Sequence, residues 1–314
     1  KKKMNKKINL IIGSGVLGAY LSLGFLKNNE KVIVTSRSIK KKYKNYQFLK
    51  IQKKVKFEKL NSNNKSEIIK ILKKYNPDKV FYFSGQSSLT KSYKLKKTTL
   101  SSHYTGTKNF LDVLREKKLK LKFFKANSGY IFKPKKGVIT LNSKFSTNKN
   151  PYITAQKKSF KIIKKYRKFK LNLFNLIFMQ IESPLRQKDF FIKKVCIGAK
   201  NKKKIKVGNI NNYRDYSWIT EIIKYIILAS KEKPRDFIIS AGKKLSGKEI
   251  LEFAYKMNNL NYKKYYLIDN KFIRKNEDKI LIGSSKNSKY LKNKYNFKFK
   301  IFGKRLIEEM YNSL

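Results

Sequence analysis

Three glycines near the start of the chain have the spacing of a phosphate-binding turn. Gly13, Gly15 and Gly18 form a G-x-G-x-x-G pattern that follows the apolar residues 8–12. In a strand, turn and helix unit, the first glycine permits the tight turn, the second lets the backbone approach a pyrophosphate, and the third lets the helix pack closely. The pattern predicts a dinucleotide-binding site. There are two alternatives. The spacing of the glycines can be due to chance, or the segment can be a signal anchor, because basic residues 1–7 followed by an apolar stretch are also typical of such anchors.

A hydroxyl and a guanidinium stand where the second strand of such a unit ends. The apolar run 31–35 leads into Ser36 and Arg37. An NAD site usually has an acid here to hold the ribose hydroxyls, whereas a guanidinium can pair two oxygens of the extra phosphate of NADP. The sequence therefore favours NADP over NAD. The alternative is that Arg37 is an ordinary surface residue.

Short apolar runs alternate with helical patterns through the first half of the chain. This alternation predicts a Rossmann-type α/β fold with a doubly wound parallel sheet. No stretch is typical of an interdomain tether, so a smaller, mostly C-terminal substrate-binding domain has to be built from insertions and the C-terminal part. The predicted strands are 8–12, 31–35, 79–83 and 121–126, and the predicted helices are 19–27, 68–74 and 105–116. The expected domains are 4–178, with returning elements at about 210–240, and 179–314.

Lysine dominates the charge of the chain. Lys and Arg number 78 against 19 Asp and Glu, for a formal net charge of +59, and only eight of the 78 are Arg. The lysines run through every segment without a nucleic-acid-binding motif, whereas a nucleic-acid surface usually concentrates charge and uses Arg. We therefore predict an enzyme from a lysine-rich lineage, with no specific nucleic acid and no membrane as partner. A binder of nucleic acid or of anionic membranes is the alternative.

The chain has one cysteine, Cys196, and one histidine, His103. These counts exclude an internal disulfide and a zinc cluster of Cys and His, so no metal site is predicted. The scarcity of cysteine favours a reducing compartment, and we expect a cytoplasmic location. A lone histidine is more often structural than catalytic, and no role is assigned to His103.

Several phrases, in a fixed order, resemble one enzyme family. Residues 76–80 and 83–88 resemble its fourth strand and the turn beside its cofactor, and Gly106-Thr107 resembles the start of its next helix. Further similar phrases are 182–186, 208–209, 214–215, 234–239 with Gly242, 273–277 and 280–283. The chain thus resembles the extended short-chain dehydrogenase/reductases, also called the NAD-dependent epimerase/dehydratase family, and within them the GDP-mannose 4,6-dehydratases. The resemblance extends from residue 8 nearly to the end.

The resemblance implies a reaction and a site. Enzymes of this kind use a tyrosine to remove a hydroxyl proton while NADP takes a hydride from the sugar of a nucleotide sugar, after which water is eliminated and the hydride returns. It implies a homo-oligomer and GDP-mannose or a related nucleotide sugar as substrate. The implied catalytic residues are Tyr152 and Ser128, and the implied cofactor contacts are Ser84, Gln86 and Gln156 besides Gly13, Gly15, Gly18, Ser36 and Arg37. The implied substrate contacts are Glu182, Lys194, Arg214, Arg274 and Glu277.

Two positions depart from the family pattern. The family has a lysine four residues after its tyrosine, where it lowers the phenol pKa and holds the ribose, but that position here is Gln156 and lysine follows at Lys157. One extra residue turns a side chain by about 100° around a helix, so Lys157 reaches the same place only through a distortion such as a π-bulge. The family's Glu, which removes a proton beside the new ketone, is replaced by Tyr130, and a phenol of pKa about 10 is a poor base at neutral pH.

Three functions are consistent with these residues. The first is a nucleotide-sugar dehydratase of the GDP-mannose 4,6 type. The second is an NADP-dependent reductase or epimerase of a nucleotide-linked hexose, which needs Tyr152 and Ser128 but no glutamate. The third is a nucleotide-binding relative without activity, in which Gln156 and Tyr130 record the loss of the chemistry.

Overall fold

The chain forms two compact units, each made from separate stretches of the sequence. The computed structural model describes residues 6–39, 43–273 and 277–314. Unit 1 contains residues 1–131, 145–177 and 226–237, and unit 2 contains residues 132–144, 178–225 and 238–314. Every residue expected to act in catalysis or cofactor binding belongs to unit 1, whereas the expected substrate contacts that the structure describes belong to unit 2.

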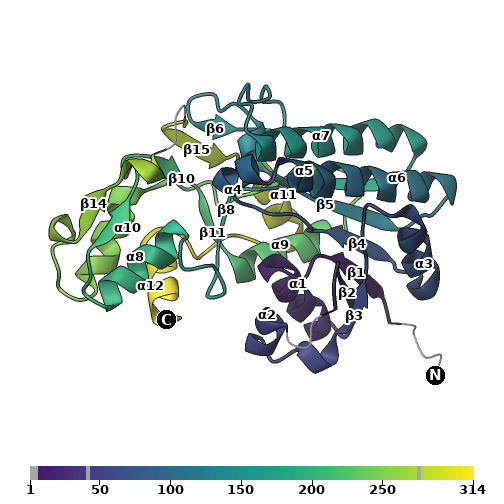
Figure 1. Ribbon diagram of the computed structural model, residues 1–314, viewed down its shortest axis with the longest axis horizontal. Coiled ribbons are helices and arrows are strands. Elements are labelled where there is room, and N and C mark those ends of the chain that lie inside the picture. Colours follow the sequence, from purple (N-terminus) through teal and green to yellow (C-terminus); the bar gives the residue numbers. More distant parts are fainter. Residues whose placement is uncertain (1–5, 40–42, 274–276) are drawn as a thin grey trace. The chain divides into compact units, whose positions relative to one another are not determined.

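Unit 1 is organised around a sheet with the strand order β12-β7-β5-β4-β1-β2-β3, of which Figure 1 labels β1 to β5. These strands are β1 (Ile8–Ile12), β2 (Lys31–Ser36), β3 (Lys56–Lys59), β4 (Lys79–Tyr82), β5 (Lys122–Ser128), β7 (Asn172–Phe178) and β12 (Asp236–Ile239). Every pairing from β3 across to β5 is parallel. The order reverses between β1 and β4, which is the point where doubly wound sheets bind nucleotides. The Rossmann-type fold expected from the sequence is confirmed.

Aromatic side chains of the central strands point alternately to the two faces of this sheet. On β4, Phe81 packs against Phe25 of α1 (Val16–Lys27), and the next residue, Tyr82, packs against Phe110 of α6 (Gly106–Glu116). On β5, Phe123 lies on the side of Tyr82. Because side chains alternate along a strand, positions 125 and 127 of β5 also face the α6 layer.

The α6 layer contains further helices and one π-helical segment. α3 (Lys65–Tyr75) and α7 (Pro151–Tyr166) are each in contact with α6, and α5 (Lys96–Leu100) is in contact with α7 (Figure 1). The segment Ser101–Thr105 between α5 and α6 is π-helical. Sequence patterning predicts one regular helix from residue 105, but the helical path begins earlier. A π-helical turn changes the direction of the side chains that follow, and this one contains the buried His103.

Unit 2 is built from short strands and three packed helices. α8 (Phe191–Lys200), α10 (Gly247–Lys256) and α12 (Gly303–Asn312) surround one apolar core that includes Cys196. One small sheet has the order β13-β10-β15-β6, and β11 pairs with β8 and β14 with β9. Their bounds are β6 (Val138–Ile139), β8 (Gln180–Glu182), β9 (Ile205–Val207), β10 (Tyr213–Arg214), β11 (Tyr216–Trp218), β13 (Leu245–Ser246), β14 (Tyr266–Ile268) and β15 (Ile280–Gly283).

The remaining helices are short or peripheral to the site. They are α2 (Lys44–Phe48), α4 (Leu89–Lys94), α9 (Ile219–Ala229) and α11 (Lys286–Tyr295). None of the helices in the described ranges has the length and apolar character that a bilayer crossing requires.

Asp112 holds three elements of the α6 layer together. Its carboxylate, almost fully buried on α6, accepts hydrogen bonds from Lys108 at 2.7 Å and from Tyr166 of α7 at 2.5 Å, and it lies 2.9 Å from the ammonium of Lys65 on α3. Burial acts to raise the pKa of this carboxyl, but the bonds from Lys108, Tyr166 and Lys65 outweigh burial and lower the pKa to about 2. The ionised form therefore stabilises the fold.

Asp112→Asn is expected to lower the free energy of unfolding by about 2 kcal/mol at pH 7, because two ammonium groups lose their buried partner. Since the folded pKa lies below the unfolded one, this stabilisation is present above about pH 4 and is lost as the pH falls toward about 2. Urea unfolding at several pH values measures both effects. Glu116→Gln, which changes a half-exposed carboxylate of the same helix, is the control. Equal losses in the two variants would contradict the role of Asp112.

Candidate active site

The glycine turn brings the ends of β1 and β4 together. Gly13 has a φ of +115°, which favours glycine, and a Cβ there would lie 3.0 Å from the backbone nitrogen of Ser84. A Cβ on Gly18 would lie 2.4 Å from the carbonyl oxygen of Gly13, so helix and turn are in direct contact. A Cβ on Gly15, by contrast, would meet nothing within 4 Å. Gly15 is also the N-cap of α1 and has no side-chain cap, so the helix start can receive an anion.

The two residues expected to select NADP, Ser36 and Arg37, lie at the end of β2 in different surroundings. The Ser36 hydroxyl donates a hydrogen bond to the carbonyl oxygen of Ser38 and lies 3.3 Å from the Tyr43 hydroxyl. Arg37 is exposed. The structure thus uses Ser36 within its own loop, and the role of both residues toward a cofactor stays a prediction.

The turn after β4 is held by its own glutamine. Gln86 Nε2 donates to Thr99 Oγ1 at 3.1 Å, and Gln86 Oε1 accepts from the backbone N–H of Ser88 at 2.7 Å. Ser84 is half-buried next to Gly13. The turn therefore reaches the glycine site through its backbone, while the Gln86 side chain fixes the turn to α5.

Tyr152 lies at the start of α7, which is capped strongly. Asn150 is the N-cap, and its side chain accepts hydrogen bonds from the backbone N–H groups of Tyr152 and Ile153 at 2.9 and 3.4 Å. Pro151 occupies the first turn, where it is favourable. The tyrosine is only 8% exposed. This cap sets where the first turn of α7 begins and so fixes the position of the phenol.

Ser128 ends the strand that packs beneath this helix. β5 and the turn that follows it are both in contact with α7. Ser128 is buried, and its Oγ accepts a hydrogen bond from the backbone N–H of Tyr130 at 3.3 Å. The two residues expected to be catalytic therefore belong to elements that pack together within unit 1.

A buried neutral imidazole connects the turn after β4 to α7. His103 Nε2 lies 2.9 Å from the carbonyl oxygen of Gln86, and Nδ1 lies 3.3 Å from Gln156 Nε2. Burial, aided by the positive charge of Lys125, lowers the pKa of His103 to about 3, so the ring is neutral at pH 7. Because a carbonyl can only accept, Nε2 carries the proton and Nδ1 accepts from the amide of Gln156. The ring also meets Tyr152 edge-on, with centroids 5.4 Å apart.

This arrangement determines what Gln156 can do. The amide nitrogen of Gln156 donates its hydrogen bond to His103. The amide oxygen Oε1 has no hydrogen-bond partner among the described residues, and the residue is only 3% exposed. A buried acceptor without a donor is costly unless a ligand supplies one. A ribose hydroxyl is a suitable donor.

Lys157 does not take the place of the missing lysine. α7 is a regular α-helix, and the Lys157 ammonium donates to the carbonyl oxygen of Ser146 at 2.8 Å. A π-bulge, which Lys157 would need in order to reach the place of the family's lysine, does not occur in α7. The π-helical turn lies instead at Ser101–Thr105, where it carries His103.

In unit 2, the residues expected to contact substrate divide into two groups. Arg214 is buried and forms an ion pair with Glu277 at 2.7 Å, so these two expected contacts meet each other. Lys194 donates to the carbonyl oxygen of Lys206 and lies 4.0 Å from the ring centroid of Phe272. Arg274 lies outside the described residues. The substrate roles of all four stay predictions.

Glu182, at the end of β8, is one of the buried acids of unit 2. Burial raises its pKa to about 7, although Arg186 and Lys193 act in the opposite direction. Its Oε2 has no hydrogen-bond partner within the described part of the chain. The carboxyl can therefore be neutral at pH 7 and can donate a hydrogen bond to a ligand.

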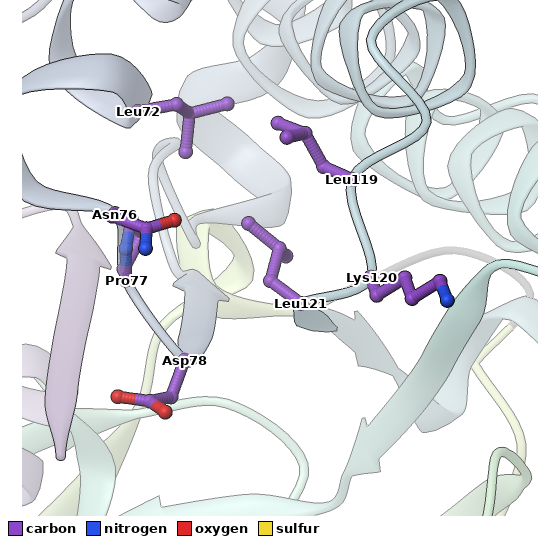
Figure 2. Close-up of a pocket in the computed structure, with 7 residues that line it drawn as sticks. All are labelled: Leu72, Asn76, Pro77, Asp78, Leu119, Lys120 and Leu121. Carbon is purple, nitrogen blue, oxygen red and sulfur yellow. The ribbon is translucent and has the colours of Figure 1, made fainter.

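A hollow at the amino ends of the strands, opposite the candidate site, is lined by none of the expected catalytic residues. Figure 2 shows residues that line it, among them Leu72, Asp78 and Leu121. Asp78 and Leu121 precede β4 and β5, so the hollow lies at the amino ends of these strands, whereas Ser84 and Ser128 lie at the carboxyl ends. Asp78 accepts a hydrogen bond from the backbone N–H of Ile8 at 2.7 Å, which is a structural role.

Sheet, glycine turn and capped tyrosine helix together define an extended short-chain dehydrogenase/reductase. A family model described as GDP-mannose 4,6 dehydratase matches residues 10–310, and the chain belongs to this family. A GDP-mannose 4,6-dehydratase of Vibrio cholerae is 24% identical over 269 residues, which cover 80% of this chain and 72% of that protein.

Solved structures support the fold over nearly the whole chain. A dTDP-glucose 4,6-dehydratase of Bacillus anthracis in complex with NAD superposes with a TM-score of 0.82 at 16% identity, covering 98% of this chain and 96% of that one. A UDP-glucose 4-epimerase of Thermotoga maritima with UDP-glucose has a TM-score of 0.83 at 15% identity, covering 98% of each chain. The family includes sugar-nucleotide dehydratases and epimerases, and its members depend on nicotinamide cofactors.

Residues of unit 1 fit such a dinucleotide. The open space at Gly15 and the uncapped start of α1 suit a pyrophosphate, and the unpartnered Gln156 Oε1 suits a ribose hydroxyl. Sequence reasoning did not assign His103 or Lys125 to this region. Lys125 is one of two lysines in the predicted strand 121–126, and its position on the strand face of Phe123 is what set it apart.

Gly15→Ala is expected to affect mainly dinucleotide binding, and Gly18→Ala mainly the stability of the fold. Gly15→Ala should lower the free energy of unfolding by no more than about 1 kcal/mol, because its Cβ meets open space. It should weaken dinucleotide binding at least about tenfold by occupying the pyrophosphate position. Gly18→Ala should destabilise by about 1–3 kcal/mol, because its Cβ meets the Gly13 carbonyl. Urea unfolding and calorimetric titration with NADP and NAD measure both. Unchanged affinity in Gly15→Ala would place the dinucleotide elsewhere.

Proposed function

We propose that this chain is a nucleotide-sugar dehydratase of the GDP-mannose 4,6 type. The observation that carries the proposal is Tyr152, a buried phenol at the capped start of α7, on a helix that packs against the strand ending in Ser128. The family match over residues 10–310 supports the choice of a nucleotide sugar as substrate. GDP-mannose is the first substrate to test.

The residues of unit 1 divide the oxidation step between them. Nicotinamide, when bound, supplies a hydride acceptor for a sugar carbon. Tyr152, as phenolate, takes the proton of the hydroxyl on that carbon, so that the C–H hydride and the O–H proton leave to different acceptors. Ser128 donates a hydrogen bond to the oxygen that becomes the carbonyl. After water has been lost, the hydride is returned to the carbon that gave up its hydroxyl and a proton is added to the neighbouring carbon, so the ketone remains and the product is lighter by one water.

For the cofactor we propose NADP, with NAD as the alternative. Support for NADP is the exposed guanidinium of Arg37 at the end of β2 and the lack of an acid at positions 36 and 37. The Bacillus anthracis dehydratase was solved with NAD, so both dinucleotides belong in the assay.

Tyr130 favours a second candidate function. Elimination of water needs a base beside the new ketone, and position 130 offers a phenol where the family has a carboxylate. Oxidation followed by reduction on the other face of the sugar needs no such base. A 4-epimerase or reductase of a nucleotide hexose therefore uses the same Tyr152 and Ser128. A nucleotide-binding relative without turnover is the third outcome.

Incubation of the protein with GDP-mannose and NADP or NAD, followed by mass analysis of the sugar nucleotide, separates these functions. A dehydratase yields a product lighter by one water, whereas an epimerase yields an isomer of equal mass. Tyr152→Phe is expected to lower the rate by about 100-fold or more, because the proton acceptor is lost. Tyr75→Phe, a half-buried tyrosine of α3, is the matched control and should retain activity.

The third outcome has its own test. If the wild type binds dinucleotide but is inert with GDP-mannose, UDP-glucose and dTDP-glucose, we expect the Tyr130→Glu/Gln156→Lys double variant to gain turnover. Loss of water catalysed by the wild type would contradict the reading of Gln156 and Tyr130 as lost chemistry.

A further inference from the structure

Lys125 is a buried cation without an acid partner. The residue is 1% exposed, and its ammonium donates to the carbonyl oxygen of the adjacent Ala126. No carboxylate of the described ranges lies within ion-pair distance of it, and burial lowers its pKa to about 7. An ammonium has three N–H donors, and leaving such a group buried without compensation destabilises a fold. A role outside folding would account for its presence.

The position of Lys125 on β5 directs it toward the catalytic helix. It lies on the same strand face as Phe123, two residues away, and this is the face covered by α6 and α7. Its ammonium is 5.5 Å from the ring centroid of Tyr82, and its charge lowers the pKa of His103. His103 in turn meets the Tyr152 ring edge-on and accepts from Gln156.

The other ionisable groups around this position do not carry a usable charge. Burial raises the pKa of Tyr82 well above its ordinary range, and its hydroxyl donates to the carbonyl oxygen of Ser102. His103 is neutral. Among the described residues that contact Lys125 or His103, Tyr152 is the group that can become negative, because its proposed role requires it to exchange a proton.

Lysines of α7 are occupied elsewhere. Lys157 donates to the carbonyl oxygen of Ser146, Lys158 lies over the ring of Tyr104, and Lys161 lies over the ring of Phe145. At position 156, the neutral amide cannot stabilise a phenolate by charge. A cation that supports Tyr152 therefore has to come from another element.

We propose that Lys125 is a positioning residue that supplies this charge from β5, and that it stabilises the phenolate of Tyr152 across the neutral ring of His103. The inference rests on the proposed acid–base role of Tyr152. Opposite charges that form in a buried site favour each other, so the protonated lysine and the ionised tyrosine stabilise one another. The family pattern has this positive charge on the tyrosine helix, four residues after the tyrosine, whereas here the charge lies on β5.

A fluorinated tyrosine at position 152 tests the coupling without any substrate. 3,5-Difluorotyrosine, whose phenol ionises near neutral pH, is incorporated site-specifically at 152, and its ¹⁹F signal is followed against pH in the protein without cofactor. Lys125→Met is expected to raise the pKa of this phenol by about one unit or more. Lys122→Met, on the same strand with its ammonium on the carbonyl oxygens of Ser230 and Glu232, should leave it unchanged. Equal pKa values in Lys125→Met and the unsubstituted protein would overturn the proposal.

Stability gives an independent readout of the same claim. Methionine fills a similar volume without a charge. Lys125→Met should therefore raise the midpoint temperature of thermal unfolding while it makes the Tyr152 phenolate less stable. A lower midpoint together with an unshifted phenol would mean that Lys125 is structural. If Lys125→Met does not fold, Lys125→Gln is titrated in its place.

Relocating the charge completes the test. With the substrate identified by product analysis, Lys125→Gln should lower turnover about tenfold or more, and Lys125→Gln/Gln156→Lys should recover it, because the second change restores a cation beside Tyr152. Independent, additive losses would contradict the proposal. A ¹⁹F shift without turnover of any nucleotide sugar would refute the proposed function but leave the Lys125–Tyr152 coupling standing. Turnover without a shift would refute the coupling alone.

Discussion

The hydrogen bond from His103 to the Gln86 carbonyl is the constraint on which the candidate site depends. It joins the turn after β4 to the helical layer, and through the other ring nitrogen it orients Gln156 on α7. The imidazole takes so much space that a Cβ on Gly85 would lie 2.3 Å from its Cε1, so only glycine fits the turn beside it. The π-helical turn aims the ring inward. One neutral side chain thus fixes the turn after β4, the π-helical turn and α7 relative to one another.

Local patterns in the sequence were sufficient for the parts of the fold that are local. The glycine spacing, the apolar runs of β1 and β2, and the helix that follows them are all readable within about 30 residues, and each was predicted. The parallel, doubly wound sheet was predicted from the alternation of strands and helices, whereas the order of its strands came from the structure. The helix from residue 105 was predicted as regular because a π-helical turn depends on tertiary packing of His103, which no periodicity records.

The candidate site was only partly readable, because its polar interior is assembled from distant segments. Tyr152 and Ser128 were predicted through resemblance, as were Arg214 and Glu277, but nothing in their spacing predicted that the last two form an ion pair. Lys125 is one of 70 lysines, so its charge could not distinguish it. Its burial could, since a lysine inside an apolar strand is rare. Burial is known only from the structure, and the sequence alone could not separate Lys125 from the partly exposed Lys122 of the same strand.

The division of unit 1 into three stretches has a consequence for synthesis of the chain. β12, at one edge of the main sheet, is made from residues 236–239, long after β7, which it covers. Until the ribosome has released that segment, the edge of β7 is open, and open edges pair readily with other chains. A nascent chain with a large positive charge repels its copies on neighbouring ribosomes. Charge repulsion of this kind acts against pairing at the open edge of β7.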